Sequence, residues 1–254
     1  SSGVQVGTEK AWNSCKHFNI PKFFLINKTD KENVNVEEVI DELKSKFGTS
    51  VVTLDDKDAL TEAIAETDEE LMEKFFSGEE FTDEEFNRGL SHGIGAGDIV
   101  PVMSCSAMTA DGVEDALAKF IDLVPKATDH EEYDAENDSG EAIKVKVDAS
   151  GKPATFVFKT IADPFLGKIS LAKVISGTLK GGQEIYNARA EKAEKLGSMF
   201  FMRGKTQEDA PAVEAGDIVA IAKLQFTKTG DTLCEKGNII KFPPVEFPEP
   251  SLYI

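Results

Sequence analysis

The sequence predicts an α/β unit followed by an all-β unit, and three observations carry this prediction. In residues 1–128, short apolar runs alternate with stretches whose apolar residues recur at helical spacing. Residues 129–141 are acidic and polar, which is typical of a linker between domains. Over residues 142–244 the helical spacing gives way to short strand-like runs separated by turn residues. Residues 245–254 end in SLYI, which predicts the first strand of a further domain.

The α/β unit is predicted to hold buried parallel strands with helices on both faces. The strands are the apolar runs KFFLI (22–26) and DIVPVM (98–103). Helices are expected in VGTEKAWNSCKHF with Thr8 as its cap, over 36–47 with Gly48 as the stop, across the amphipathic stretch 60–75, after Thr82, and over 113–124. The helix after Thr82 has the clearest start, because Thr82 and Glu85 form a capping box.

The all-β unit is predicted to be a small antiparallel barrel. Its strand candidates are TFVFKTI, KISLAKVI, EIYNARA and IVAIAKL. Turn signals such as Asp163-Pro164, Gly181-Gly182 and Gly230-Asp231 separate these runs, and the spacing favours a barrel or a sandwich.

Composition excludes several classes of protein. No run of 18 apolar residues occurs, so no membrane span is predicted, and the N-terminal residues do not resemble a signal peptide. Three cysteines, far apart in sequence, indicate a reducing compartment, and no Cys or His spacing indicates zinc. The net charge of −18 comes almost entirely from residues 55–85 and 129–141, and this acidity argues against a free-standing nucleic-acid binder.

The first candidate site is the run Asn27-Lys28-Thr29-Asp30, directly after the first predicted strand. One carboxylate such as that of Asp30 can accept both N1–H and N2–H of guanine, an amide can meet the N7/O6 edge, and a lysine stem can lie over the base. Adenine lacks that donor pair, so a site of this kind discriminates strongly. The alternative is a polar turn between a strand and a helix.

The second candidate site is Ser104-Cys105-Ser106-Ala107, directly after the second predicted strand. A tight turn here can aim a backbone N–H at guanine O6. Two loops that follow two strands of one parallel sheet face the same edge, where ligands bind in such sheets. A lone S-x-S-A carries little information, so the pairing of the two loops is the signal.

Proteins that bind nucleotides at the edge of a parallel sheet often hold the phosphates with the motif G-x-x-x-x-G-K-[ST]. This sequence has no complete copy of that motif. Gly204-Lys205-Thr206 matches its end, but Met199 stands where the first glycine is required, and FFMR before it predicts a strand. We therefore expect no phosphate loop, no catalytic residue and no metal ligand in this chain.

The residues quoted above resemble translation elongation factor G. The stretches GVQVGTEKAW, FFLINKTD, ELMEKFFSGEEFTDEEF and GDIVPVMSCSA are similar to the second half of its P-loop-type GTP-binding domain. TFVFKTIADPFLGKISLAKVISGTLKGGQEIYN and AGDIVAIAKLQFTKTGDTL resemble its second domain, a barrel, and VEFPEPSLYI resembles the first strand of its third. The resemblance implies that Asn27, Lys28, Asp30, Ser106 and Ala107 bind the base of GTP or GDP.

The resemblance also implies what the rest of such a protein does. The intact parent would be a cytoplasmic GTPase that binds the ribosome and drives translocation, with Mg²⁺ held by motifs that precede Ser1. This chain, as a fragment, should not hydrolyse GTP alone. An insertion that the family carries before ELMEKFF is short and acidic here, so its role is open. Two alternatives stay open: a non-enzymatic RNA- or protein-binding module, and a sister translational GTPase such as a ribosomal protection factor. No sequence-specific DNA partner is expected.

Overall fold

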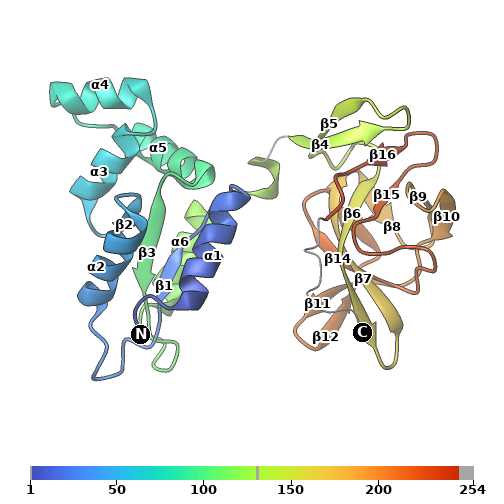
Figure 1. The fold of residues 1–254 in the computed structure, drawn as a ribbon, viewed down its shortest axis with the longest axis horizontal. Helices are drawn as coiled ribbons and strands as arrows, with labels where there is room; N and C mark the ends of the chain where they lie inside the picture. Colours follow the sequence, from blue (N-terminus) through green and yellow to red (C-terminus); the bar gives the residue numbers. More distant parts are fainter. Residues whose placement is uncertain (1, 130–131, 246–254) are drawn as a thin grey trace. The chain divides into compact units, whose positions relative to one another are not determined.

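The computed structural model describes residues 2–129 and 132–245, and the chain divides into two compact units at Pro125. Figure 1 shows a unit of helices around a small sheet and a unit made of strands. The elements of the first unit are α1 (Val6–His17), β1 (Phe24–Ile26), α2 (Val36–Phe47), β2 (Val51–Thr53), α3 (Lys57–Ala65), α4 (Glu69–Ser77), α5 (Asp83–Ala96), β3 (Val100–Ser104) and α6 (Val113–Leu123).

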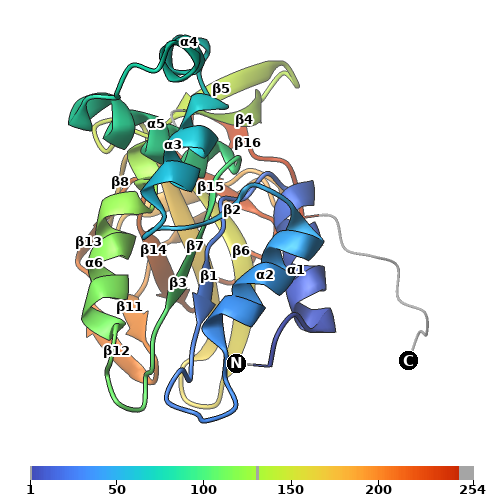
Figure 2. The same ribbon diagram turned by 90° about the vertical axis from the view of Figure 1, so that its left-hand side faces the viewer.

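The first unit is built on a three-stranded parallel sheet in the order β1-β3-β2. Helices α1 and α2 pack on one face, where Trp12 stacks on Phe24 and Phe47. Helices α3, α4, α5 and α6 supply the cluster on the other side, which includes Ile64 and Ile94 with no exposed surface. Figure 2 shows α6 and the pair α1–α2 on opposite sides of the strands. The predicted parallel sheet with both faces covered is confirmed.

Most helix boundaries follow the sequence signals. Gly48 ends α2 in a positive-φ conformation (φ 96°), and Thr82 and Glu85 form the predicted capping box of α5. Helix α1 differs, because it begins at Val6 and Thr8 lies inside its first turn, where its hydroxyl accepts from the Gln5 N–H. The single amphipathic stretch predicted over 60–75 is two helices. Asp68 separates them by capping α4 through the N–H groups of Glu70 and Leu71.

The second unit is antiparallel throughout its three sheets. The largest has eight strands in the order β10-β9-β15-β6-β7-β14-β11-β12, beside the pair β13-β8 and the three strands β16-β4-β5. The elements are η1 (Ala127–Asp129), β4 (Glu132–Asn137), β5 (Ala142–Lys146), β6 (Ala154–Asp163), β7 (Gly167–Ser176), β8 (Thr178–Lys180), β9 (Glu184–Asn187), β10 (Lys192–Lys195), β11 (Met199–Arg203), β12 (Thr206–Asp209), β13 (Ala212–Glu214), β14 (Ile218–Ala222), β15 (Thr232–Cys234) and β16 (Ile240–Lys241). The predicted antiparallel β unit is confirmed, and its closure into a barrel stays a prediction.

The acidic segment 129–141 differs from the predicted linker. Its residues Glu132–Asn137 form β4, which pairs with β5 and β16. Tyr133 and Ala135 point into the cluster of the β unit, whereas the acidic side chains alternate with them. The segment is therefore part of the β unit because its alternation, rather than its charge, decides its structure. The strand predicted over 245–254 lies outside the described residues except for Val245.

Candidate functional site

The first candidate loop leaves the sheet directly after β1. Ile26 is buried at the end of the strand, Asn27 is half-buried, and Lys28 and Asp30 are exposed. The Asn27 side-chain Oδ1 accepts from the Lys28 N–H at 2.7 Å, and Lys28 adopts a left-handed conformation (φ 68°). The chain therefore turns sharply at Lys28, and this turn places Asn27 and Asp30 on the same loop at the sheet edge.

The second candidate loop leaves the sheet directly after β3. Ser106 is almost fully buried (1% exposed), and its N–H donates to the Asp111 carbonyl at 2.8 Å in a single β-bridge. The Ser106 hydroxyl also accepts from the Thr109 N–H at 3.3 Å. These bonds close residues 106–111 into a small loop, from which Ala107 is exposed.

The two loops meet at the carboxyl edge of the sheet. Because β1 and β3 are parallel, with Ile26 opposite Ser104, the chain leaves both strands side by side. The Ser106 hydroxyl donates to Asp30 Oδ1 at 2.5 Å, and the Ala107 N–H donates to Asn27 Oδ1 at 3.0 Å. The backbone adds two bonds, from the Cys105 N–H to the Ile26 carbonyl (2.9 Å) and from the Thr29 N–H to the Cys105 carbonyl (3.4 Å).

Four of the five predicted site residues therefore touch one another, and Lys28 lies exposed on the same loop. Since Asn27 Oδ1 is held by backbone N–H groups, its Nδ2 is the atom left to donate to a ligand. In the described part of the chain, Asp30 uses only Oδ1 for a protein partner, which leaves Oδ2 as an acceptor. The junction thus offers a donor and a carboxylate acceptor at one edge.

Motif reasoning gave no role to two residues that support the second loop. Cys105 joins both loops through its backbone, and Asp111 anchors Ser106. The Asp111-Gly112 turn before the helix predicted over 113–124 marks where the loop must close, but no spacing shows which residues hold it.

The run Gly204-Lys205-Thr206 is a turn in the β unit. Strands β11 and β12 pair with Arg203 opposite Thr206, so Gly204 and Lys205 form a two-residue hairpin loop, with Gly204 at φ 60°. A phosphate loop precedes a helix, whereas this turn joins two antiparallel strands. Across residues 2–129 and 132–245, no group of three His, Cys, Asp or Glu side chains could hold a metal ion. The residues present fit the base of a guanine nucleotide, but they do not fit its phosphates or a magnesium ion.

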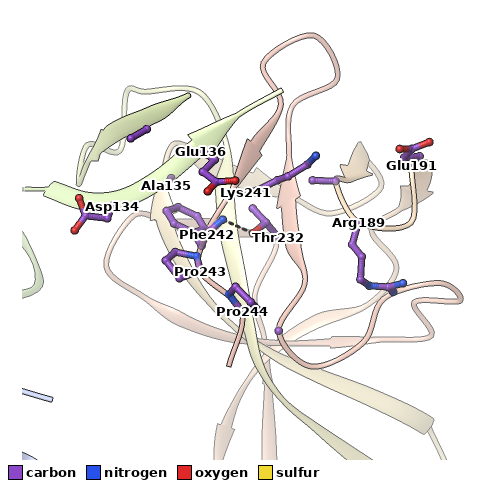
Figure 3. Close-up of a pocket in the computed structure, with 13 residues that line it drawn as sticks. Asp134, Ala135, Glu136, Arg189, Glu191, Thr232, Lys241, Phe242, Pro243 and Pro244 are labelled. Atoms are coloured by element: carbon purple, nitrogen blue, oxygen red, sulfur yellow. Dashed lines mark hydrogen bonds between the residues drawn. The ribbon is translucent and has the colours of Figure 1, made fainter. Parts of the chain in front are cut away.

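A cavity of about 680 Å³ lies elsewhere, in the β unit (Figure 3). Charged side chains of both signs line it above an apolar floor of Phe242, Pro243 and Pro244. Its guanidinium, Arg189, is already bound to the buried carboxylate of Asp231 and to the Phe226 carbonyl. None of the predicted site residues lines this cavity, so it is separate from the candidate site.

Charge and hydropathy give one further observation. In the part of the chain that the structure describes, no helix is long and apolar enough to cross a membrane.

Two family models match the chain, one on each unit. The elongation factor Tu GTP-binding domain matches residues 1–126, and domain 2 of elongation factor G matches residues 152–236. An elongation factor G from Neorickettsia sennetsu is 28% identical over 300 aligned residues, which cover 100% of this chain and 43% of the relative. A crystal structure of a Thermus thermophilus protein superposes with a TM-score of 0.79 at 22% identity, covering 99% of this chain and 42% of the other, and shows the same fold.

The chain thus spans less than half the length of the curated relative that it matches. The two matches follow one another in the order of the two units, and the candidate loops lie inside the first match. The chain therefore belongs to the translational GTPases, as part of a GTP-binding domain followed by a domain 2 of the elongation factor G type.

Proposed function

We propose that the first unit reads the guanine base of GTP and GDP for a translational GTPase of the elongation factor G type. The observation that carries this proposal is the junction of the two loops, in which Ser106 bonds Asp30 and Ala107 bonds Asn27. The whole protein would be an elongation factor, as the name of the Neorickettsia relative suggests, and our proposal extends this to action on the ribosome, in translocation, in the cytoplasm. In this proposal residues 1–128 belong to the GTP-binding domain and 245–254 begin a further domain.

Guanine recognition follows from the chemistry of the junction. Asp30 accepts N1–H and N2–H of the base, and the Ser106 hydroxyl bond keeps that carboxylate in place. Asn27 Nδ2 donates to N7, because its Oδ1 is turned inward toward the Ala107 N–H. The exposed Lys28 stem lies over the base. Adenine offers no donor pair to Asp30, so binding adenine leaves a carboxylate facing an acceptor.

GTP hydrolysis needs groups that this sequence does not encode. Phosphoryl transfer depends on phosphate-binding backbone, a lysine and Mg²⁺, and the sole G-K-T run is a hairpin turn. When bound in the whole protein, Mg²⁺ would neutralise charge on the phosphates. Within the chain, Asn27, Lys28, Asp30, Ser106 and Ala107 contribute base selection and orientation only.

The insertion expected between α2 and α4 is proposed to be shortened. The alignment with the Neorickettsia protein spans 300 residues, more than the 254 of this chain, so this chain lacks counterparts for part of the matched span. The interval in this structure is β2 and α3, with few residues to spare around them.

A titration tests the proposal directly. The purified chain is titrated with GDP, ADP and xanthosine diphosphate by ligand-observed NMR, which measures the weak affinities expected without phosphate contacts. We expect GDP to bind measurably more tightly than ADP, by at least about tenfold, since ADP forfeits two hydrogen bonds to Asp30. Equal affinity for GDP and ADP contradicts guanine recognition.

One observation favours the non-enzymatic alternative for the β unit. Residues 142–244 hold 16 Lys and Arg against 11 Asp and Glu, although the whole chain carries −18. This stretch alone is cationic and suits a polyanion such as RNA, whereas the acidic residues 129–141 of the same unit oppose such a partner. The same titration separates the readings, because a binding module with an inert α/β scaffold gives no preference for GDP. A sister translational GTPase would give the same GDP preference and differs in its action on the ribosome.

A further inference from the structure

Gly112 packs behind the second candidate loop at the start of α6. It is the N-cap of that helix and adopts a left-handed conformation (φ 68°). A Cβ atom added at Gly112 would lie 2.9 Å from the Ser104 carbonyl oxygen and 3.4 Å from the Cys105 Cα. Both are backbone atoms, which cannot rotate away as the end of a side chain can. Any side chain at residue 112 must therefore push the backbone of Ser104 and Cys105.

That stretch of backbone sets the position of both contacts between the loops. The Cys105 N–H is bonded to the Ile26 carbonyl of the neighbouring strand, and the next residues in the chain are Ser106 and Ala107. A shift at Cys105 therefore moves the Ser106 hydroxyl relative to Asp30 and the Ala107 N–H relative to Asn27, whose bonds are 2.5 and 3.0 Å long. A displacement of a few tenths of an ångström is enough to weaken bonds of this length.

We infer that Gly112 is a positioning residue for guanine selection: the absence of its side chain lets the second loop sit close enough to join the first. This inference rests on the proposed function, and it adds a residue outside the five predicted base-reading residues, one that lies against the backbone of Ser104 and Cys105. Gly112 acts through Ser104 and Cys105, so its replacement alters which base is preferred and not merely how stable the unit is.

The chain offers a matched control for backbone strain. Gly78 ends α4 in the same unit, with a similar left-handed conformation (φ 76°), and a Cβ added there meets nothing within 4 Å. Gly78→Ala therefore imposes the same kind of strain without the contact. Asn tolerates left-handed backbone better than Ala but still carries a Cβ atom, so Gly112→Asn and Gly78→Asn separate contact from strain.

The experiment compares GDP and ADP affinities of the wild-type chain and these four variants by ligand-observed NMR, with circular dichroism to confirm folding. We expect both Gly112 variants to lose about three- to tenfold in GDP affinity, as for one misaligned hydrogen bond, with ADP affinity unchanged. Both Gly78 variants should keep the wild-type ratio of GDP to ADP affinity, even where their thermal midpoints fall. If Gly112→Ala does not fold, Gly112→Asn decides the matter.

The two proposals fail differently. A wild-type chain without preference for GDP overturns the proposed function and this inference together. A wild-type chain that prefers GDP, with Gly112 variants that retain the same preference, overturns only the role of Gly112. An equal loss of selectivity at Gly78 also overturns it, because strain alone would then account for the effect.

Discussion

Replacing Asp30 by asparagine tests the base-reading role of the junction at the atom that is proposed to read. The change keeps the shape of the side chain, and the amide oxygen of Asn can still accept the Ser106 hydroxyl that now bonds Asp30 Oδ1 at 2.5 Å. The connection between the two loops is therefore preserved. What changes is the group facing the ligand, because an NH₂ donor replaces the second carboxylate oxygen.

The magnitude follows from the bonds that are exchanged. Guanine presents N1–H and N2–H to this position, so the variant places donor against donor at the amino group. A charge-assisted hydrogen bond contributes about 1.5–3 kcal/mol, and about 1.4 kcal/mol corresponds to a factor of ten. GDP affinity should thus fall roughly ten- to a hundredfold. Xanthine has a carbonyl at the same carbon, which accepts from the new amide, so xanthosine diphosphate should bind better than GDP.

The assay titrates GDP and xanthosine diphosphate against the wild-type chain, Asp30→Asn and Ser106→Ala. The Ser106 variant is the control, since it removes the hydroxyl bond but keeps the carboxylate. We expect it to weaken GDP by a few-fold without any gain for xanthosine diphosphate. Unchanged GDP affinity in Asp30→Asn would refute the reasoning, because Asn caps a turn about as well as Asp and only the structural role would be left.

Three further outcomes are expected. The purified chain should release no phosphate from GTP above a buffer blank, because it encodes no phosphate loop; phosphate release that follows the protein peak on a sizing column contradicts this. Hydrogen bonds from Lys74 and, to a smaller extent, from the Thr82 N–H lower the pKa of Glu85 from 4.5 to about 2. The ionised Glu85 therefore stabilises the fold above pH 4.5, and this stabilisation is lost as the pH falls toward 2. The difference in thermal midpoint between wild type and Glu85→Gln should shrink over that pH range, and a constant difference rules out the linkage. Asp231→Ala should lower the free energy of unfolding of the β unit by about 2–4 kcal/mol, because Asp231 is 2% exposed and bonds the buried Asn187. Asp134→Ala, which removes the exposed ion pair with Lys144, should lower it by less than about 1 kcal/mol. Urea unfolding measures both, and equal losses refute the difference between a buried and an exposed pair.

Local signals predicted those elements whose ends carry their own chemistry. The capping box of Thr82 and Glu85 and the terminal Gly48 fix helix ends within a few residues, so α5 and α2 begin or end where the sequence indicates. The strands β1 and β3 were recognisable as continuous apolar runs. Strand β3 is buried over residues 100–102, whereas the edge strand β1 leaves Leu25 exposed. Strand β2 (Val51–Thr53) was missed because its two valines lead directly into the acidic stretch that begins at Asp55. In the structure it pairs with β3.

The acidic strand β4 shows why composition misleads where alternation does not. Residues 132–137 read as a linker by charge, yet Tyr133 and Ala135 alternate with Glu132, Asp134 and Glu136 at the period of a strand. A strand whose sheet has one face toward solvent needs apolar side chains only on the other face. Ala135 is 5% exposed, and both it and Tyr133 pack in the cluster of the β unit. These two inward-facing side chains and the pairing with β5 are enough to form the strand.

The candidate site was predictable because two loops that follow parallel strands must share an edge, whereas the tripeptide Gly204-Lys205-Thr206 had no such support. Both motifs are short enough to occur by chance, and the structure separates them by the elements on either side. Asn27 follows a parallel strand whose neighbour, β3, delivers Ser106 and Ala107 to the same place. Lys205 lies in a two-residue loop between antiparallel strands, so no helix begins there whose N-terminal N–H groups could bind phosphate. The contacts behind the site, at Cys105 and Gly112, escaped the sequence analysis because they depend on distances between backbone atoms that no spacing along the chain encodes.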